Sequence, residues 1–380
     1  MSTDSVSPFR IHATDAELED LKRRLRATRW PEHETVDDWS QGIPLAYVQE
    51  IASYWAETYD WRAREARLNA FPQFHTEIDG CAIHFVHVRS PHEDALPLLI
   101  THGWPGSIVE FQEVIGPLSD PTAHGGAARD AFHVVCPSLP GYGFSGKPSA
   151  TGWDGRRIAD AWGVLMQRLG YSRYVAQGGD WGALVTTCIG HQDPKHCAAI
   201  HLNMPMVPPD PETKDDLTPA EQASRAAMLE HRRWGTGYSK QQSTRPQTLG
   251  YGLVDSPAGQ AAWILEKFWA WTDCDGHPEN ALTRDQLLDN VMLYWLPGTG
   301  ASSARLYWES FRKPPRDPVQ VPVGCSIFPK EILYTSRRWA EKHFGSLLYW
   351  NELERGGHFA AFEQPAIFVD ELRNCFRPLR

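Results

Sequence analysis

The sequence Tyr-Val-Ala-Gln-Gly-Gly-Asp-Trp-Gly at residues 174–182 joins a short apolar run to a stretch with helical spacing. Glycine two residues before and two residues after a reactive side chain, at a turn from strand to helix, is typical of a nucleophile elbow. Small residues are needed at those two places because the turn is sharp and the backbone passes close to itself. Asp180 is therefore a candidate nucleophile, in the position that serine takes more often. The alternative interpretation is that Asp180 only caps the following helix.

Apolar runs and helical stretches alternate on both sides of this elbow. Of the 380 residues, 42% are hydrophobic and 22% are charged, which is ordinary for a globular protein that buries a large core. Strands are expected at 81–88, 96–101, 132–137, 174–177, 198–202 and 321–328, and helices at 158–169 and 182–191. Alternation of this kind predicts an α/β fold, with a parallel sheet and helices on both of its faces.

Changes in composition divide the chain into three parts. Residues 1–75 are polar, rich in tryptophan and mostly helical in pattern, and we expect them to form an N-terminal module. The segment 208–318 begins in a proline- and acid-rich stretch and continues with helical patterns, which predicts a helical lid. Residues 76–207 and 319–380 carry the alternation of strands and helices, and they form the predicted core that the lid interrupts.

A second motif, HGWPG at residues 102–106, follows the expected strand at 96–101. Alone, it reads as an ordinary Gly/Pro turn. In α/β hydrolases, however, a turn of this kind supplies one backbone N–H group to the oxyanion hole, and the residue after the nucleophile supplies another. The order of the two motifs therefore predicts an α/β-hydrolase fold, with the backbone N–H groups of Trp104 and Trp181 as the donors.

The general base is expected late in the chain. His358 lies in a Gly-Gly-His-Phe turn, after a strand-like stretch at 347–351 and before the expected last helix. The acid that orients this histidine should follow the strand at 321–328, where Glu331 is found. Asp317, which precedes that strand, is a weaker candidate. The order nucleophile, acid, histidine is that of the α/β hydrolases.

The sequence also argues against several partners and cofactors. A net charge of −10 disfavours nucleic acid and anionic membranes. The first fifteen residues are polar and unlike a signal peptide, and the seven cysteines include no CxxC pair. The glycine-rich run at 141–147 is not a phosphate-binding loop, because Pro148 stands where serine or threonine is required. The histidines show no metal-binding spacing such as HExxH. We therefore expect a cytoplasmic protein without nucleic acid, membrane, metal or cofactor.

Taken together, the motifs resemble those of the microsomal-type epoxide hydrolases, over nearly the whole chain. The resemblance rests on HGWPGS (102–107), GGDWG (178–182), GGHFAAFEQP (356–365) and the N-terminal stretch WRAREARLNAFPQFHTEIDG (61–80). The last of these belongs to a module that is peculiar to the group. Membrane-bound members of the family carry an N-terminal anchor. The polar start of this chain does not resemble such an anchor, so we do not expect membrane attachment.

The resemblance also implies two catalytic tyrosines in the lid. The predicted lid contains four tyrosines: Tyr238, Tyr251, Tyr294 and Tyr307. The segment at 235–259 is similar to the family around its first tyrosine and the segment at 302–310 around its second, which assigns Tyr238 and Tyr307. For Tyr251 and Tyr294 we expect a role in packing only.

The activity that the resemblance implies is the hydrolysis of an epoxide to a vicinal diol, without a cofactor. Asp180 would attack a strained epoxide carbon and form an alkyl-enzyme ester. Tyr238 and Tyr307 would donate to the leaving oxygen. Water activated by His358, which Glu331 orients, would then cleave the ester. The tryptophan-rich lid favours an apolar or aryl epoxide as the small-molecule substrate.

Other functions remain open at this point. A haloalkane dehalogenase shares the aspartate, the acid and the histidine, but it does not need paired lid tyrosines. An ester hydrolase is disfavoured because aspartate replaces serine at the elbow, and a binding module without catalysis would not need the full set of residues. The sequence leaves open the physiological epoxide, the regio- and enantioselectivity, and whether the role is detoxification, aromatic hydrocarbon catabolism or secondary metabolite biosynthesis. It also allows a homodimer.

Overall fold

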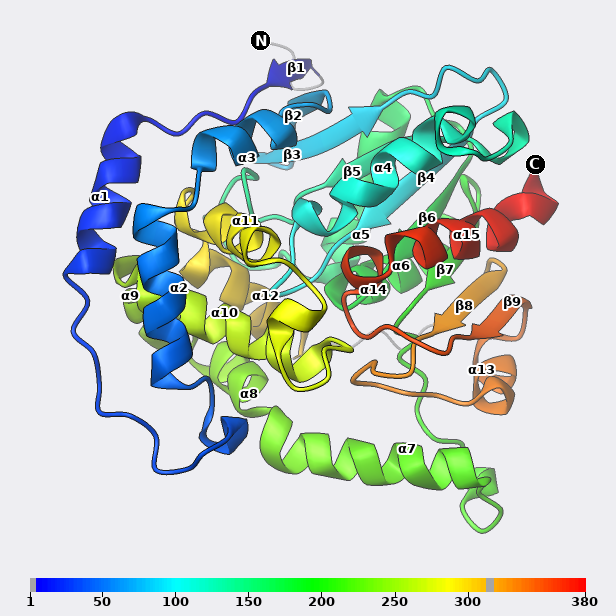
Figure 1. Cartoon of the computed structure of the whole chain (residues 1–380). Helices are drawn as coiled ribbons and strands as arrows, with labels where there is room; N and C mark the ends of the chain where they lie inside the picture. The colour runs from blue at the N-terminus through cyan, green and yellow to red at the C-terminus, as the bar shows by residue number, and fades with distance from the viewer. Residues whose placement is uncertain (1–4, 312–317) are drawn as a thin grey trace.

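The computed structural model describes residues 5–311 and 318–380, and within them nine strands form one sheet (Figure 1). The order of the strands is β1-β2-β3-β5-β4-β6-β7-β8-β9. Their bounds are β1 (Val6–Phe9), β2 (Gln73–Ile78), β3 (Cys81–Val88), β4 (Leu96–Thr101), β5 (Phe132–Pro137), β6 (Tyr174–Gly178), β7 (Cys197–Leu202), β8 (Val323–Ile327) and β9 (Leu347–Glu352). β1, β2, β3 and β5 pair antiparallel, and the pairs from β5 through β4 to β9 are parallel. The predicted α/β-hydrolase fold is thus confirmed.

Helices cover both faces of this sheet. Helices α5 (Gly155–Arg168) and α6 (Trp181–Gln192) pack together on one face, while α4 (Gln112–Ser119) and α15 (Pro365–Phe376) pack together on the other (Figure 1). The parallel strands from β4 to β8 are almost completely buried, β6 along its whole length, because both of their faces are covered, whereas the edge strand β9 is only half-buried. The short helices α13 (Arg337–Phe344) and α14 (Ala360–Glu363) complete the core.

The chain between β7 and β8 forms a layer of helices beside the sheet. These helices are α7 (Pro219–Glu230), α8 (Gly237–Thr244), α9 (Pro246–Asp255), α10 (Pro257–Trp271), α11 (Arg284–Trp295) and α12 (Gly300–Ser310). A π-helical turn, His231–Gly235, joins α7 to α8. The helical pattern predicted for the segment 208–318 is confirmed by these helices.

The N-terminal segment packs against these lid helices. Its helices are α1 (Asp15–Arg26), α2 (Leu45–Glu57) and α3 (Trp61–Leu68), and α1 and α2 contact α10. Asp289 of α11 is buried and accepts hydrogen bonds from Tyr59 and Arg64 of the N-terminal segment. The segment also contributes β1 to the edge of the sheet. This strand has only four residues, mostly exposed, so it leaves no apolar alternation in the sequence.

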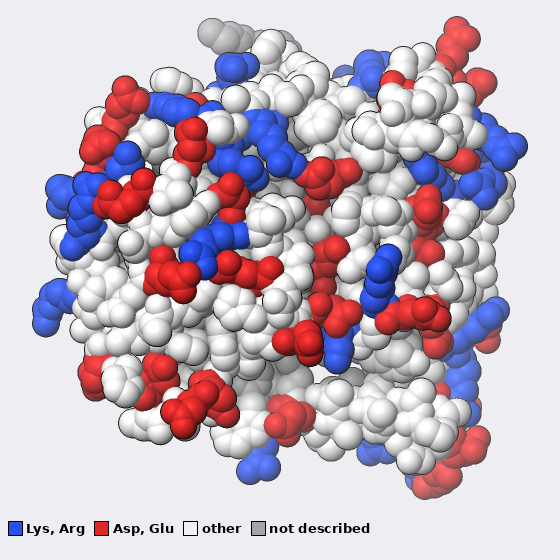
Figure 2. Space-filling view, viewed as in Figure 1, with Lys and Arg blue, Asp and Glu red and all other residues white. Residues whose placement is uncertain are grey.

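None of the helices in the described ranges combines the length and the hydropathy that a bilayer crossing requires. On the face shown in Figure 2, acidic and basic side chains are interspersed, which is usual for a surface in contact with water.

Candidate active site

The two sequence motifs meet at the carboxyl edge of the sheet, because the strands that precede them are neighbours. Thr101 at the end of β4 and Gly178 at the end of β6 are register partners. The turn that follows β6 holds Asp180 at φ 50° and ψ −125°, in a region that favours glycine. A side chain at Gly178 would overlap the backbone of Gly182, and one at Gly182 would overlap the carbonyl of Thr101. This crowding explains the Gly-x-Asp-x-Gly spacing.

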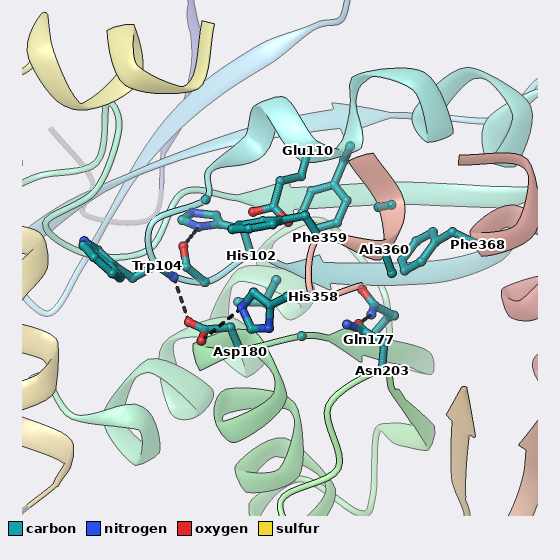
Figure 3. Close-up of a pocket in the computed structure, with 16 residues that line it drawn as sticks. His102, Trp104, Glu110, Gln177, Asp180, Asn203, His358, Phe359, Ala360 and Phe368 are labelled. Carbon is teal, nitrogen blue, oxygen red and sulfur yellow. Dashed lines mark hydrogen bonds and ion pairs between the residues drawn. The ribbon is translucent and has the colours of Figure 1, made fainter. Parts of the chain in front are cut away.

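The loop after β4 places a backbone donor on Asp180. The N–H group of Trp104 donates to Asp180 Oδ1 at 2.8 Å (Figure 3). A side chain at Gly103 would overlap that of Asp180, so this glycine permits the close approach. Trp181 is the first residue of α6, and its N–H group therefore has no partner from a preceding helical turn. The structure thus places both predicted oxyanion donors next to Asp180.

His358 bridges two carboxylates. Its Nε2 atom lies 3.4 Å from Asp180 Oδ2, and its Nδ1 atom lies 2.7 Å from Glu331 Oε1. The side chains of His358 and Glu331 are each only 2% exposed. Burial lowers the pKa of His358, but the charges of Glu331 and Asp180 outweigh burial and raise the pKa well above its ordinary value. Asp317, the weaker candidate for the acid, lies outside the described residues.

A second buried carboxyl group fixes the backbone of the histidine loop. Glu363 accepts hydrogen bonds from the N–H groups of Phe359 at 2.9 Å and Asp273 at 2.7 Å. The N–H group of His358 itself donates to the carbonyl of Trp271, at the end of α10. The loop is therefore held by contacts with the lid. The sequence does not indicate this role of Glu363, because its hydrogen-bond partners are backbone groups.

Tyr238 and Tyr307 come together beside the elbow. The ring of Tyr238 stacks on Trp104 with centroids 5.0 Å apart, and the ring of Tyr307 lies edge-on to Trp181 at 4.6 Å. The two tyrosine rings are 5.8 Å from each other. Burial raises the pKa of both hydroxyl groups, so both stay protonated. In the part of the chain that the structure describes, the buried Tyr307 hydroxyl makes no hydrogen bond.

Of the other two tyrosines in the segment 208–318, Tyr294 packs in the core as predicted, whereas Tyr251 does not. Tyr251 is 72% exposed, because its side of α9 faces solvent. Tyr294 is buried on α11, and its hydroxyl donates to the carbonyl of Gly106 at 2.7 Å. From the same helix, Asn290 Nδ2 donates to the carbonyl of Pro105 at 2.7 Å. Helix α11 therefore holds the loop that carries the Trp104 N–H group.

The Tyr294→Phe variant should lose about 1–3 kcal/mol of unfolding free energy, because the Gly106 carbonyl would remain buried without its donor. Urea unfolding measures this loss as a lower midpoint at an unchanged slope. Tyr251→Phe is the matched control. Because Tyr251 is exposed, this variant should lose less than about 0.5 kcal/mol of unfolding free energy. Equal midpoints for the two variants would contradict a structural role of the Tyr294 hydroxyl.

Within the described ranges, no group of three or more His, Cys, Asp or Glu side chains is placed to hold a metal ion. The groups that surround Asp180 are carboxylates, an imidazole, phenols and backbone donors.

Comparisons with known proteins identify the family of the chain. Two family models match, epoxide hydrolase N terminus over residues 6–111 and alpha/beta hydrolase fold over residues 97–229. A Stigmatella aurantiaca protein named "Putative epoxide hydrolase" is 58% identical and aligns over 99% of this chain and 86% of its own length. Epoxide hydrolase 1 of Sus scrofa is 36% identical, over 97% of this chain and 88% of its own. The solved structure of Aspergillus niger epoxide hydrolase has a TM-score of 0.89 at 34% identity, over 99% of this chain and 97% of that one. The chain belongs to the epoxide hydrolase family.

Proposed function

We propose that this protein adds water to an epoxide and releases a vicinal diol, by way of an ester between the substrate and Asp180. The observation that carries the proposal is the set of groups around the Asp180 carboxylate. The Trp104 N–H group holds one oxygen, His358 lies against the other, and two buried tyrosines flank the elbow. Family membership supports the same reaction.

In the first step, the carboxylate of Asp180 attacks an epoxide carbon and opens the ring. A carboxylate is already nucleophilic and needs no base, whereas a serine at this position would need a base to remove its proton. The leaving oxygen becomes basic as the ring opens. Tyr238 and Tyr307 keep their protons because burial raises the pKa of each hydroxyl, so either can donate to this oxygen.

In the second step, His358 takes a proton from water, and the water oxygen attacks the ester carbonyl of Asp180. Esterification removes the negative charge of Asp180, one of the two charges that raise the pKa of His358. The imidazole therefore gives up its proton more readily once the ester has formed. Glu331 holds Nδ1, so that Nε2 faces the reacting groups. The N–H groups of Trp104 and Trp181 stabilise the oxyanion that forms.

The substrate class that we propose is an apolar or aryl epoxide. An open cleft of about 1000 Å³ is lined by the tryptophans 39, 234, 269 and 271 and also reaches Glu331. Trp271 contacts both Tyr238 and His358, so it connects this cleft with the site. Glu230, Glu266 and Glu331 line the cleft against one lysine, Lys330, and this excess of negative charge disfavours anionic substrates. Rates with aryl, aliphatic and carboxylated epoxides of similar size would rank these preferences.

We propose that the enzyme is cytoplasmic, because of the state of its cysteines. All seven cysteines lie in the described part of the chain, and all are buried thiols that form no disulfide there, which suits a reducing compartment. Detoxification, aromatic hydrocarbon catabolism and secondary metabolite biosynthesis each need a different epoxide. The epoxide that gives the highest kcat/KM would therefore indicate which of the three roles the enzyme has.

A single turnover in water enriched in heavy oxygen tests the covalent mechanism. We expect the label in the Asp180 side chain and not in the first diol, because the diol oxygen comes from the epoxide and from the unlabelled carboxylate. Mass spectrometry of the peptide that contains Asp180 and of the diol measures both. A labelled first diol would mean that water attacks the epoxide directly.

A haloalkane dehalogenase is the second candidate, and one observation favours it. The indole N–H group of Trp181 is buried and, among the described residues, makes no close hydrogen bond, although the Tyr307 hydroxyl lies near it. Such a donor can hold a halide ion. Halide release from short haloalkanes, compared with diol release from epoxides of similar size, distinguishes the two activities.

A further inference from the structure

A small enclosed cavity lies on the core side of Asp180. Its volume of about 20 Å³ is enough for one water molecule. Its lining comes entirely from residues 101–203 and 358–368, and it includes Asp180 and His358 (Figure 3). Neither Tyr238 nor Tyr307, beside which we place the epoxide, is among the residues that line the cavity.

One wall of the cavity contains an unpaired acceptor. Gln177 Nε2 donates to Asn203 Oδ1 at 2.8 Å, and this bond fixes the Gln177 amide. Gln177 Oε1 is left buried and, within the described residues, without a hydrogen-bond partner. Buried polar atoms in native proteins are almost always paired, often with an ordered water. A water in this cavity would satisfy Gln177 Oε1.

The cavity also contains a carboxyl group that the mechanism so far does not use. Glu110 lies in the 3₁₀ turn Ile108–Phe111 and is only 9% exposed. A side chain at position 106 would overlap the Glu110 carboxyl group, so Gly106 provides the space for it. In Figure 3, Glu110 lies above His358, and Gln177 and Asn203 lie beside His358. A water here would have acceptors from two walls and would lie next to the base.

The pKa of Glu110 reflects its surroundings in the cavity. Burial raises the pKa of Glu110 to about 8, the positive charge of His358 acts to lower it, and the negative charge of Asp180 acts to raise it. The carboxyl group is thus electrostatically coupled to both groups that act in the second step. A water bound there can form a charge-assisted hydrogen bond whenever Glu110 is ionised.

We propose that Glu110 and Gln177 hold the hydrolytic water in this cavity, and that Glu110 is a further catalytic residue for the cleavage of the ester. This inference rests on the proposed ester at Asp180. The water O–H bond breaks, the proton moves to His358 Nε2, and the water oxygen bonds to the carbonyl carbon of Asp180. The ester C–O bond then breaks, and the departing alcohol oxygen takes a proton from His358. The second proton of the water leaves the new carboxyl group and returns to the tyrosine that gave its proton to the epoxide oxygen, so Asp180 is left as a carboxylate.

The test follows the two steps separately in the Glu110→Gln variant of the full-length protein, with styrene oxide as the probe. Formation of the ester should keep a nearly normal rate. At pH 9, where a carboxyl group with a pKa of about 8 is mostly ionised, hydrolysis of the ester should slow about 10- to 100-fold, the effect of losing one hydrogen bond to a charged group. Rapid quench and mass spectrometry of the intact protein measure the ester at each time. A purely structural role of Glu110 would slow both steps together.

Two further variants keep this test decisive. Gln177→Met removes the other acceptor and should slow hydrolysis more than ester formation, which supports the inference even if Glu110→Gln does not fold. Glu371→Gln is the matched control, since Glu371 is a buried carboxyl group that bonds Ser326 and Asn351 at a distance from the cavity, and it should leave the ratio of the two rates unchanged. Normal hydrolysis in both Glu110→Gln and Gln177→Met overturns the inference. If the wild type forms no ester at all, the proposed function fails instead.

Discussion

The His358→Gln variant should accumulate the alkyl-enzyme ester and release almost no diol. Glutamine can hold the same space, but it cannot take a proton from water, and a positioned general base contributes roughly 10²–10⁴-fold. Ester formation does not need this base, because Asp180 and the lid tyrosines carry that step. Mass spectrometry of the intact protein after mixing with styrene oxide should show one substrate mass added, which persists for many wild-type turnovers.

The Glu331→Gln variant provides the graded comparison for this result. It keeps His358 but removes one of the two charges that raise the pKa of the imidazole. We expect hydrolysis to slow less than in His358→Gln, because the base is still present and only its orientation and charge stabilisation are weakened. If ester formation falls as much as hydrolysis in His358→Gln, then His358 also acts in the first step. A fully active Glu331→Gln enzyme would assign the acid to another residue.

The elbow could be predicted from the sequence because its cause is local. Gly178 and Gly182 are required by backbone atoms within a few ångströms of the turn, so the requirement appears as a short spacing pattern. The turn that carries Trp104 and the late position of His358 were predictable in the same way, from their places after strands. Register pairing of β4 with β6 then brings the first two motifs together.

The residues that support the site could not be predicted from the sequence, because their hydrogen-bond partners are distant in the chain and are mostly backbone groups. The partner of Tyr294 is the carbonyl of Gly106, 188 residues earlier, and no property of Tyr294 itself indicates that bond. The place of Glu110 depends on the missing side chain at Gly106, which the sequence shows only as one more glycine in a turn. The choice of Tyr238 and Tyr307 came from family resemblance, since only the folded lid brings α8 and α12 to the same side of Asp180.

Replacing Tyr238 and Tyr307 together by phenylalanine should almost abolish formation of the ester. The alkoxide that leaves the opening ring is strongly basic, and a positioned general acid is worth roughly 10²–10⁴-fold. Each single variant should lose only part of that factor, because the other hydroxyl remains beside the elbow. Phenylalanine keeps the rings that pack on Trp104 and Trp181, so the double variant should remain folded. Stopped-flow tryptophan fluorescence is suited to the measurement, because these two tryptophans flank Asp180.

The control for this experiment is Tyr251→Phe, because Tyr251 is exposed and lies outside the cluster of rings around Asp180. Tyr294→Phe is unsuitable as a control, since its hydroxyl holds the loop of Trp104. A near-normal rate of ester formation in the double variant would mean that the lid does not supply the acid. A halide leaving group needs no proton, and the buried indole N–H group of Trp181 could receive it. In that case haloalkane dehalogenation, tested by halide release, would become the better account of this site.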